Sequence, residues 1–145
     1  MWNLPQTGEK ENSKVPDLQT GIRLEGLPDI MSFLKKESET YIVLVTAPDL
    51  STARSLARSA LKQRLAACVN LIPKIESHYW WEDKLDRSEE TLMVIKTARN
   101  RLQGLHDLIL SEHPYDTPEY LCIPVSSGNR GYLKWIRASV LGPDA

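Results

Sequence analysis

Cysteine is scarce in this sequence, because the only two, Cys68 and Cys122, lie far apart and form no CxxC pair. This pattern does not fit a secreted disulfide framework and favours a reducing compartment. Long hydrophobic runs are missing too, since no apolar stretch approaches the ~20 residues that a membrane-spanning helix needs. The first residues lack the basic start and the apolar core of a signal peptide. We therefore expect a cytoplasmic protein that does not insert into membranes.

A large net charge of either sign is also absent. The 18 Lys and Arg residues nearly balance the 19 Asp and Glu residues, which leaves a formal net charge of −1. Such a chain has no overall field that attracts DNA, RNA or acidic membranes, so we expect no nucleic-acid partner. The 145 residues, 41% hydrophobic and 26% charged, indicate one ordinary globular domain with a core of its own.

Sustained hydrophobic periodicity is missing from residues 1–38, which mix prolines, glycines and charges. We interpret this segment as a mostly disordered N-terminal extension, and residues 39–145 as the folded domain. An alternative stays open for part of the extension. Ile30, Phe33 and Leu34 recur at helical spacing and would form one face of a short helix docked on the domain.

Within the domain, the hydrophobic period switches between that of strands and that of helices. The patterns predict a buried strand at 41–45, a helix after the capping residue Asp49, a long strand over 65–81, a return strand over 89–97, a helix capped by Asn100, a strand over 120–125 and a short C-terminal helix. Pro73 should bend or bulge the long strand. This order is that of a ferredoxin-like βαββαβ sandwich, an α+β fold in which both helices cover one face of a four-stranded antiparallel sheet.

Aromatic residues are few, and three of them stand together at Tyr79, Trp80 and Trp81. Side chains alternate along a strand, so Trp80 points away from its two neighbours and the three rings cannot share one core layer. The sheet face without helices needs a cover as well. Both features predict self-association, with Tyr79, Trp80 and Trp81 in the subunit interface.

The segment 112–119 carries the candidate site. Its two prolines hold the backbone extended and keep the neighbouring side chains in place. An imidazole, a phenol and carboxylates lie within these eight residues, and such groups ligate metals or transfer protons. We predict that His113 and Glu119, helped by Glu112, bind a divalent metal ion weakly. A structural role, in which His113 only bonds a backbone carbonyl, is an equally open interpretation.

No catalytic function is expected. The chain lacks a Ser or Cys nucleophile in a recognised setting, a phosphate-binding glycine loop and a dinucleotide-binding fingerprint. A competing enzymatic interpretation makes His113 a base that Glu119 orients. A scaffold for partner proteins is a third interpretation.

Several blocks of this sequence resemble the CutA divalent-cation-tolerance family, and together they span most of the region 41–135. They are Thr46-Ala47-Pro48-Asp49, Arg64 to Pro73, Tyr79-Trp80-Trp81, Lys96-Thr97, His113-Pro114-Tyr115 with Pro118-Glu119, and Tyr132-Leu133 with Trp135. The resemblance implies a homotrimer whose long hairpins pair between subunits. It also implies a link to copper tolerance and copper binding, and an architecture similar to that of the PII signalling proteins. Animal members are associated with acetylcholinesterase assembly, so partner proteins are a further expectation.

Two positions depart from the copper ligands that this resemblance implies. The family ligands are a cysteine in the first strand and a His-His pair, whereas this chain has Val45 and Glu112 at two of the three positions. Only His113 remains, so copper or zinc should bind weakly. We therefore expect a trimeric, non-catalytic CutA-like protein implicated in divalent metal (copper) ion binding and tolerance. The alternative is a PII-like regulatory or scaffold protein that binds a small effector or a partner protein.

Overall fold

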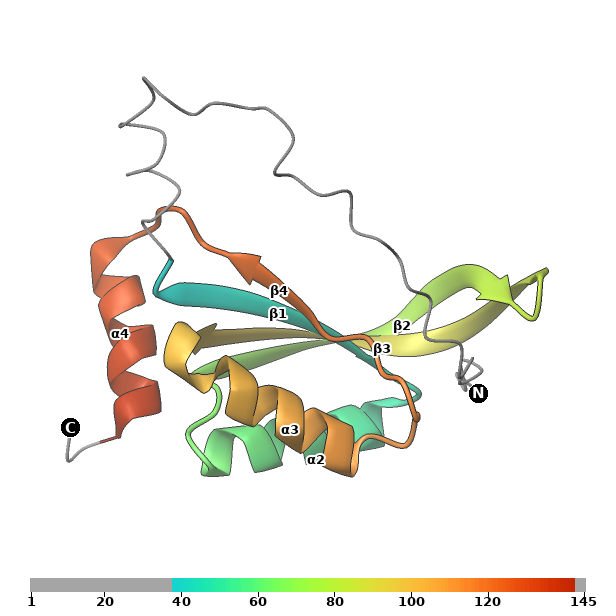
Figure 1. The fold of residues 1–145 in the computed structure, drawn as a ribbon, viewed down its shortest axis with the longest axis horizontal. Coiled ribbons are helices and arrows are strands. Elements are labelled where there is room, and N and C mark those ends of the chain that lie inside the picture. The colour runs from blue at the N-terminus through green and yellow to red at the C-terminus, as the bar shows by residue number, and fades with distance from the viewer. Residues whose placement is uncertain (1–37, 143–145) are drawn as a thin grey trace, which may run out of the picture. The chain divides into compact units, whose positions relative to one another are not determined.

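A four-stranded antiparallel sheet organises the computed structural model, which describes residues 38–142 (Figure 1). The elements follow in the order β1 (Thr40–Ala47), α2 (Leu50–Lys62), β2 (Cys68–Trp81), β3 (Lys84–Ala98), a 3-10 turn η1 (Arg99–Arg101), α3 (Leu102–Glu112), β4 (Leu121–Pro124) and α4 (Arg130–Leu141). The strands lie side by side in the order β2-β3-β1-β4. The predicted α+β fold class is confirmed. Residues 1–37 of the predicted extension, with the short helix expected there, lie outside the described residues.

The hydrophobic core lies between the sheet and two helices. Val43 and Val45 of β1, together with Met93 and Ile95 of β3, point to the same face and are fully buried. Helices α2 and α3 cover this face (Figure 1). The buried face of α2 consists mainly of alanines, which lets the helix approach the sheet closely. The prediction that both helices share one face is thus confirmed.

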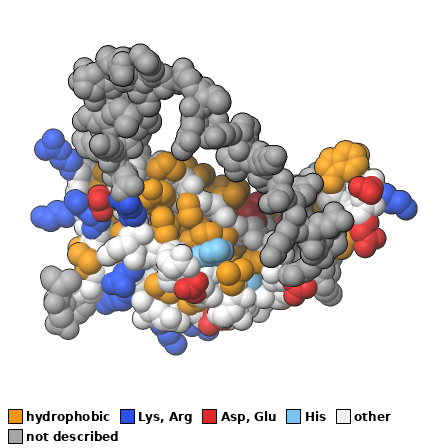
Figure 2. All heavy atoms as spheres, viewed as in Figure 1, with side chains coloured by type: hydrophobic (Ala, Val, Ile, Leu, Met, Phe, Trp, Pro, Cys, Tyr) orange, Lys and Arg blue, Asp and Glu red, His pale blue; other side chains and the backbone are white. Residues whose placement is uncertain are grey.

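Neither α2 nor α3 covers the opposite face of the sheet, here called the open face, and α4 contacts only β3 and β1 of the four strands closely. Alternation along the strands places Ile42 and Leu44 of β1 on it, opposite Ile123 and Leu121 of β4. The last two are 44% and 54% exposed. Figure 2 shows hydrophobic side chains gathered across the middle of the molecule, in the region of β4. An exposed apolar surface of this kind marks an interaction site.

The hairpin of β2 and β3 extends beyond the rest of the sheet. The last pair of β1 with β3 joins Ala47 to Thr91, whereas β2 and β3 stay paired out to the turn. We call residues 75–81 and 84–90 the arm; it projects on the right of Figure 1. A break in register at Pro73 separates the arm from the body, as predicted.

The turn of the arm is tighter than the sequence suggested. Only Glu82 and Asp83 connect the strands, and both have positive φ angles, 48° and 60°, as in the type I′ turns that favour the twist of a hairpin. Strand β3 therefore begins at Lys84 rather than at Glu89. The polar residues just after the turn concealed this extension, because an arm exposed on both faces has no hydrophobic alternation.

Helix starts were predicted with mixed success. Asp49 caps α2, since its carboxylate accepts a hydrogen bond from the Thr52 N–H at 2.7 Å. The expected Asn100 cap is wrong, because Asn100 lies inside the 3-10 turn and α3 begins at Leu102 without a side-chain cap. The guanidinium of Arg101 donates from Nε and Nη2 to the Val140 carbonyl at 3.1 and 2.8 Å, and this long-range contact with α4 holds the turn.

Candidate functional site

The imidazole of His113 fastens the loop that follows α3. His113 is the C-terminal cap of α3, and only 7% of it is exposed. Its Nδ1 accepts a hydrogen bond from the Tyr115 N–H at 3.0 Å, so Nε2 carries the proton and donates to the Thr46 carbonyl at 2.7 Å. Both ring nitrogens are therefore engaged with backbone groups. These contacts support the structural interpretation of His113.

Burial keeps this imidazole neutral. It lowers the pKa of His113 below the ordinary value of 6.5, although the bond to Thr46 and the charge of Glu90 act in the opposite direction. A protonated ring would present an N–H at Nδ1 to the N–H of Tyr115 and break that hydrogen bond. The loop geometry thus requires the neutral form.

We expect the stability of the protein to fall as the pH drops below about 6.5. Because the folded pKa of His113 is lowered, the unfolded chain binds more protons in that range, and protonation favours unfolding. Glu119, whose pKa is raised from 4.5, contributes a slope of the opposite sign at lower pH. The measurement is urea unfolding between pH 5.5 and 8 for the native chain and for His113→Ala. The variant should lose the slope, while His78→Ala, which removes an exposed imidazole, should retain it.

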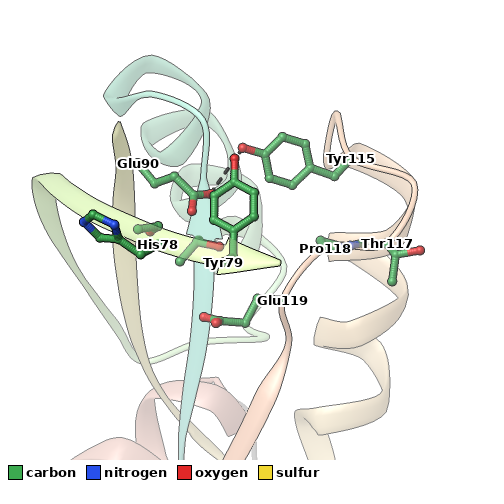
Figure 3. Close-up of a pocket in the computed structure, with 9 residues that line it drawn as sticks. His78, Tyr79, Glu90, Tyr115, Thr117, Pro118 and Glu119 are labelled. Carbon is green, nitrogen blue, oxygen red and sulfur yellow. Dashed lines mark hydrogen bonds between the residues drawn. The ribbon is translucent and has the colours of Figure 1, made fainter. Parts of the chain in front are cut away.

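A cavity of about 370 Å³ lies between the loop and the base of the arm. Its lining, drawn in Figure 3, consists of Thr46, Ser77, His78, Tyr79, Glu90, Tyr115, Thr117, Pro118 and Glu119. We call it the loop–arm cavity. Tyr115 brings the two sides together, because its hydroxyl donates a hydrogen bond to Glu90 Oε2 at 3.2 Å.

Two carboxylates face the loop–arm cavity. Glu90 is only 2% exposed. Glu119 is exposed, but its carboxyl group is partly desolvated by its neighbours. This burial, followed by the charge of Glu90, raises the pKa of Glu119. Burial raises the pKa of Tyr115 as well, and the Glu90 charge adds to the effect. The two carboxylates therefore repel each other electrostatically, and a cation between them would relieve that repulsion.

The structure separates the predicted metal residues. Glu119 lines the loop–arm cavity, whereas neither His113 nor Glu112 is among its lining residues, and Glu112 lies exposed at the end of α3. Within residues 38–142, no group of three or more His, Cys, Asp or Glu side chains is arranged to hold a metal ion. The metal site therefore stays a prediction, and of the three predicted ligands only Glu119 lies at the cavity.

The three residues of the aromatic cluster, Tyr79, Trp80 and Trp81, do not share one environment. Tyr79 lines the loop–arm cavity, and in Figure 3 its ring and that of Tyr115 point toward Glu90. Trp80 is 68% exposed on the other face of the arm, opposite Leu85, which is 73% exposed. Trp81 is half-buried.

Glu90 is the residue that sequence reasoning missed. It lies in line with Leu92 and Val94 on one face of β3, so the pattern places a carboxylate at a position where apolar residues are expected. A buried carboxylate needs hydrogen-bond or charge partners. That signal was available in the sequence, but its partner Tyr115 comes from a distant loop that no local pattern connects to it.

The strand order and the position of the cavity define the class of this protein. It is a ferredoxin-like α+β domain with a projecting hairpin and a cavity at the base of that hairpin. The model of the family described as CutA1 divalent ion tolerance protein matches residues 41–139. This chain belongs to that family.

Named relatives agree with the match. The divalent-cation tolerance protein CutA of Salmonella newport (strain SL254) is 46% identical over 102 residues, which cover 70% of this chain and 89% of the relative. The crystal structure of CutA1 from Oryza sativa is 40% identical, with a TM-score of 0.66 over 69% of this chain and 92% of that one. A structure described as the periplasmic divalent cation tolerance protein CutA from Archaeoglobus fulgidus is 36% identical, with a TM-score of 0.68 over 70% and 98% of the two chains.

The described α-helices are at most 13 residues long. Within residues 38–142, none is both long enough and apolar enough to cross a membrane.

Proposed function

We propose that this protein is a non-catalytic, homotrimeric protein of divalent-cation tolerance that binds a divalent metal ion weakly in the loop–arm cavity. One observation carries the proposal. Glu90 and Glu119 face the same cavity, and the described residues that line it include no Lys or Arg to neutralise them.

The donor set suits a weakly held ion. Two carboxylates, Glu90 and Glu119, supply charge, whereas the imidazole of His78 points away from them in Figure 3 and lies 3.3 Å from Glu76 on the arm. Carboxylate oxygens are ligands for zinc and copper, the metals we propose. Water completes the coordination shell, since the described residues offer no closed set of three ligands in place. His113 acts in this proposal as a positioning residue that holds Tyr115, and Glu112 stays outside the site.

The trimer is proposed from the two edge strands of the described sheet and from its open face. Among the described strands, β2, which continues along the arm, and β4 form the two edges of the sheet. Such edges invite pairing with another chain. Leu121 and Ile123, half exposed on the open face, would be buried by the same association. The number three comes from the family resemblance, whereas the proposed cytoplasmic location rests on the two scattered cysteines, which fit a reducing compartment.

Metal-induced stabilisation tests the site. Saturating zinc or copper should raise the melting temperature of the native trimer, because binding to the folded state contributes about 2.7 kcal/mol at a hundred times Kd. Glu119→Gln should remove this increase, whereas Glu112→Gln, a matched change at the end of α3, should retain it. The reverse result would place the metal at the end of α3 and contradict the cavity site.

A further inference from the structure

The loop–arm cavity is larger than a hydrated metal ion requires. Six water molecules occupy roughly 180 Å³, at about 30 Å³ each in the liquid, whereas the cavity measures about 370 Å³. That volume falls within the range of roughly 300–1,000 Å³ that is typical of sites for small organic molecules. A metal with its water shell would therefore not fill the cavity.

The walls of the cavity combine aromatic rings with negative charge. The rings of Tyr79 and Tyr115 flank the buried carboxylate of Glu90, and Pro118 adds an apolar surface from the loop (Figure 3). Glu119 supplies a second carboxylate on the loop side. Faces of tyrosine rings attract cations, and carboxylates pair with them directly.

From these features we propose that the loop–arm cavity binds a small organic cation, a compound in which an ammonium group is attached to an apolar or aromatic body. The proposal rests on the proposed function only in placing the ligand site in this cavity, and it names a different class of ligand. The ammonium group would lie between Glu90 and Glu119, and the body would lie against Tyr79 and Pro118.

The charge of the cavity excludes the other classes of small ligand. An anion would be repelled by both carboxylates and would find no Lys or Arg among the described lining residues. A neutral molecule would leave the charge of Glu90, which is 2% exposed, without compensation. An ammonium group carries three donors and no acceptor, so it can bond Glu119 and the Glu90 oxygen that Tyr115 does not occupy.

The cavity is preorganised for such a ligand. Tyr115 is held at its N–H by His113 and at its hydroxyl by Glu90, so both ends of the residue are fixed before binding. A fixed wall reduces the loss of side-chain freedom on binding.

Three probes of similar shape test the proposal: benzylammonium chloride, benzyl alcohol and sodium benzoate. The full chain, freed of metal with a chelator, is titrated with each at pH 7.5 and followed by NMR chemical shifts. We expect saturable binding of benzylammonium in the millimolar range, with shifts at Tyr79, Tyr115 and Glu119, and at least tenfold weaker binding of the other two. Equal binding of benzyl alcohol, or no saturable binding of benzylammonium, would overturn the proposal.

Matched variants locate the charge. Glu90→Gln and Glu119→Gln should each weaken benzylammonium binding at least tenfold, about 1.4 kcal/mol, whereas Glu112→Gln should leave it unchanged. Glu119→Gln keeps the test valid if the buried Glu90 variant fails to fold, since Glu119 is exposed. Unchanged binding in Glu119→Gln would contradict the proposed contact.

Metal titration of the same sample separates this inference from the proposed function. Zinc binding without benzylammonium binding would sink the organic-cation site and leave the metal site standing. Benzylammonium binding without any metal response would contradict the proposed metal site and support the organic-cation site.

Discussion

Replacing His113 with Ala should lower the free energy of unfolding by about 3 kcal/mol. The substitution removes a side chain that is 7% exposed and leaves the Tyr115 N–H and the Thr46 carbonyl without their partner. A buried polar group without a partner costs about 1–3 kcal/mol, and the space left by the ring adds to the loss. Urea unfolding at pH 7.5 measures the effect.

Two comparisons give the result its meaning. His78→Ala, at an exposed position on the arm, should change stability by less than about 0.5 kcal/mol. The metal response separates the two roles of His113. If His113→Ala melts like the native protein but no longer responds to zinc or copper, His113 is a metal ligand and not the fastening of the loop.

The second consequence of His113→Ala concerns the loop–arm cavity. Tyr115 would keep its bond to Glu90 at 3.2 Å but lose the one at its backbone. A wall held at one end is less preorganised, so ligand binding should weaken even though His113 does not line the cavity.

The sequence was most informative where hydrophobic periodicity is strong. The buried run in β1 and the alanine face of α2 have the periods of a two-faced strand and of an amphipathic helix, so the order of elements could be predicted. The bulge at Pro73 followed from the missing N–H of proline. The start of β3 was the exception. Its first residues are polar and lie in the arm, outside the core, so they show no hydrophobic periodicity.

The candidate site could be predicted only in part, because it joins segments that are distant in the sequence. The two prolines indicated that the loop 113–119 holds side chains in place, and Glu119 does line the cavity. The contact of Tyr115 with Glu90 spans 25 positions and depends on how β3 passes the end of β1. The loop that follows α3 reaches β3 at this position, and no local sequence pattern predicts that long-range contact.

The fold also explains why the arm is the most promising place to test assembly. Beyond the pair of Ala47 with Thr91, no other described strand of the sheet pairs with β2 or β3. Isolated two-stranded hairpins are marginally stable in water. A projecting arm with exposed Trp80 and Leu85 is therefore expected to gain order from a neighbouring subunit.

Trp80→Ala should weaken the association of the proposed trimer by about 2 kcal/mol or more. Trp80 is 68% exposed in the single chain, so its ring is available to a neighbour, and large aromatic residues at the centre of interfaces often contribute this much. Sedimentation equilibrium over a range of protein concentrations measures the change. Leu110→Ala is the matched control, because Leu110 is an apolar residue of α3 that is 49% exposed on the helix side, away from the arm and the open face. A native chain that sediments as a monomer at micromolar concentration would refute the trimer, and dissociation by Leu110→Ala but not by Trp80→Ala would move the interface from the arm to the helices.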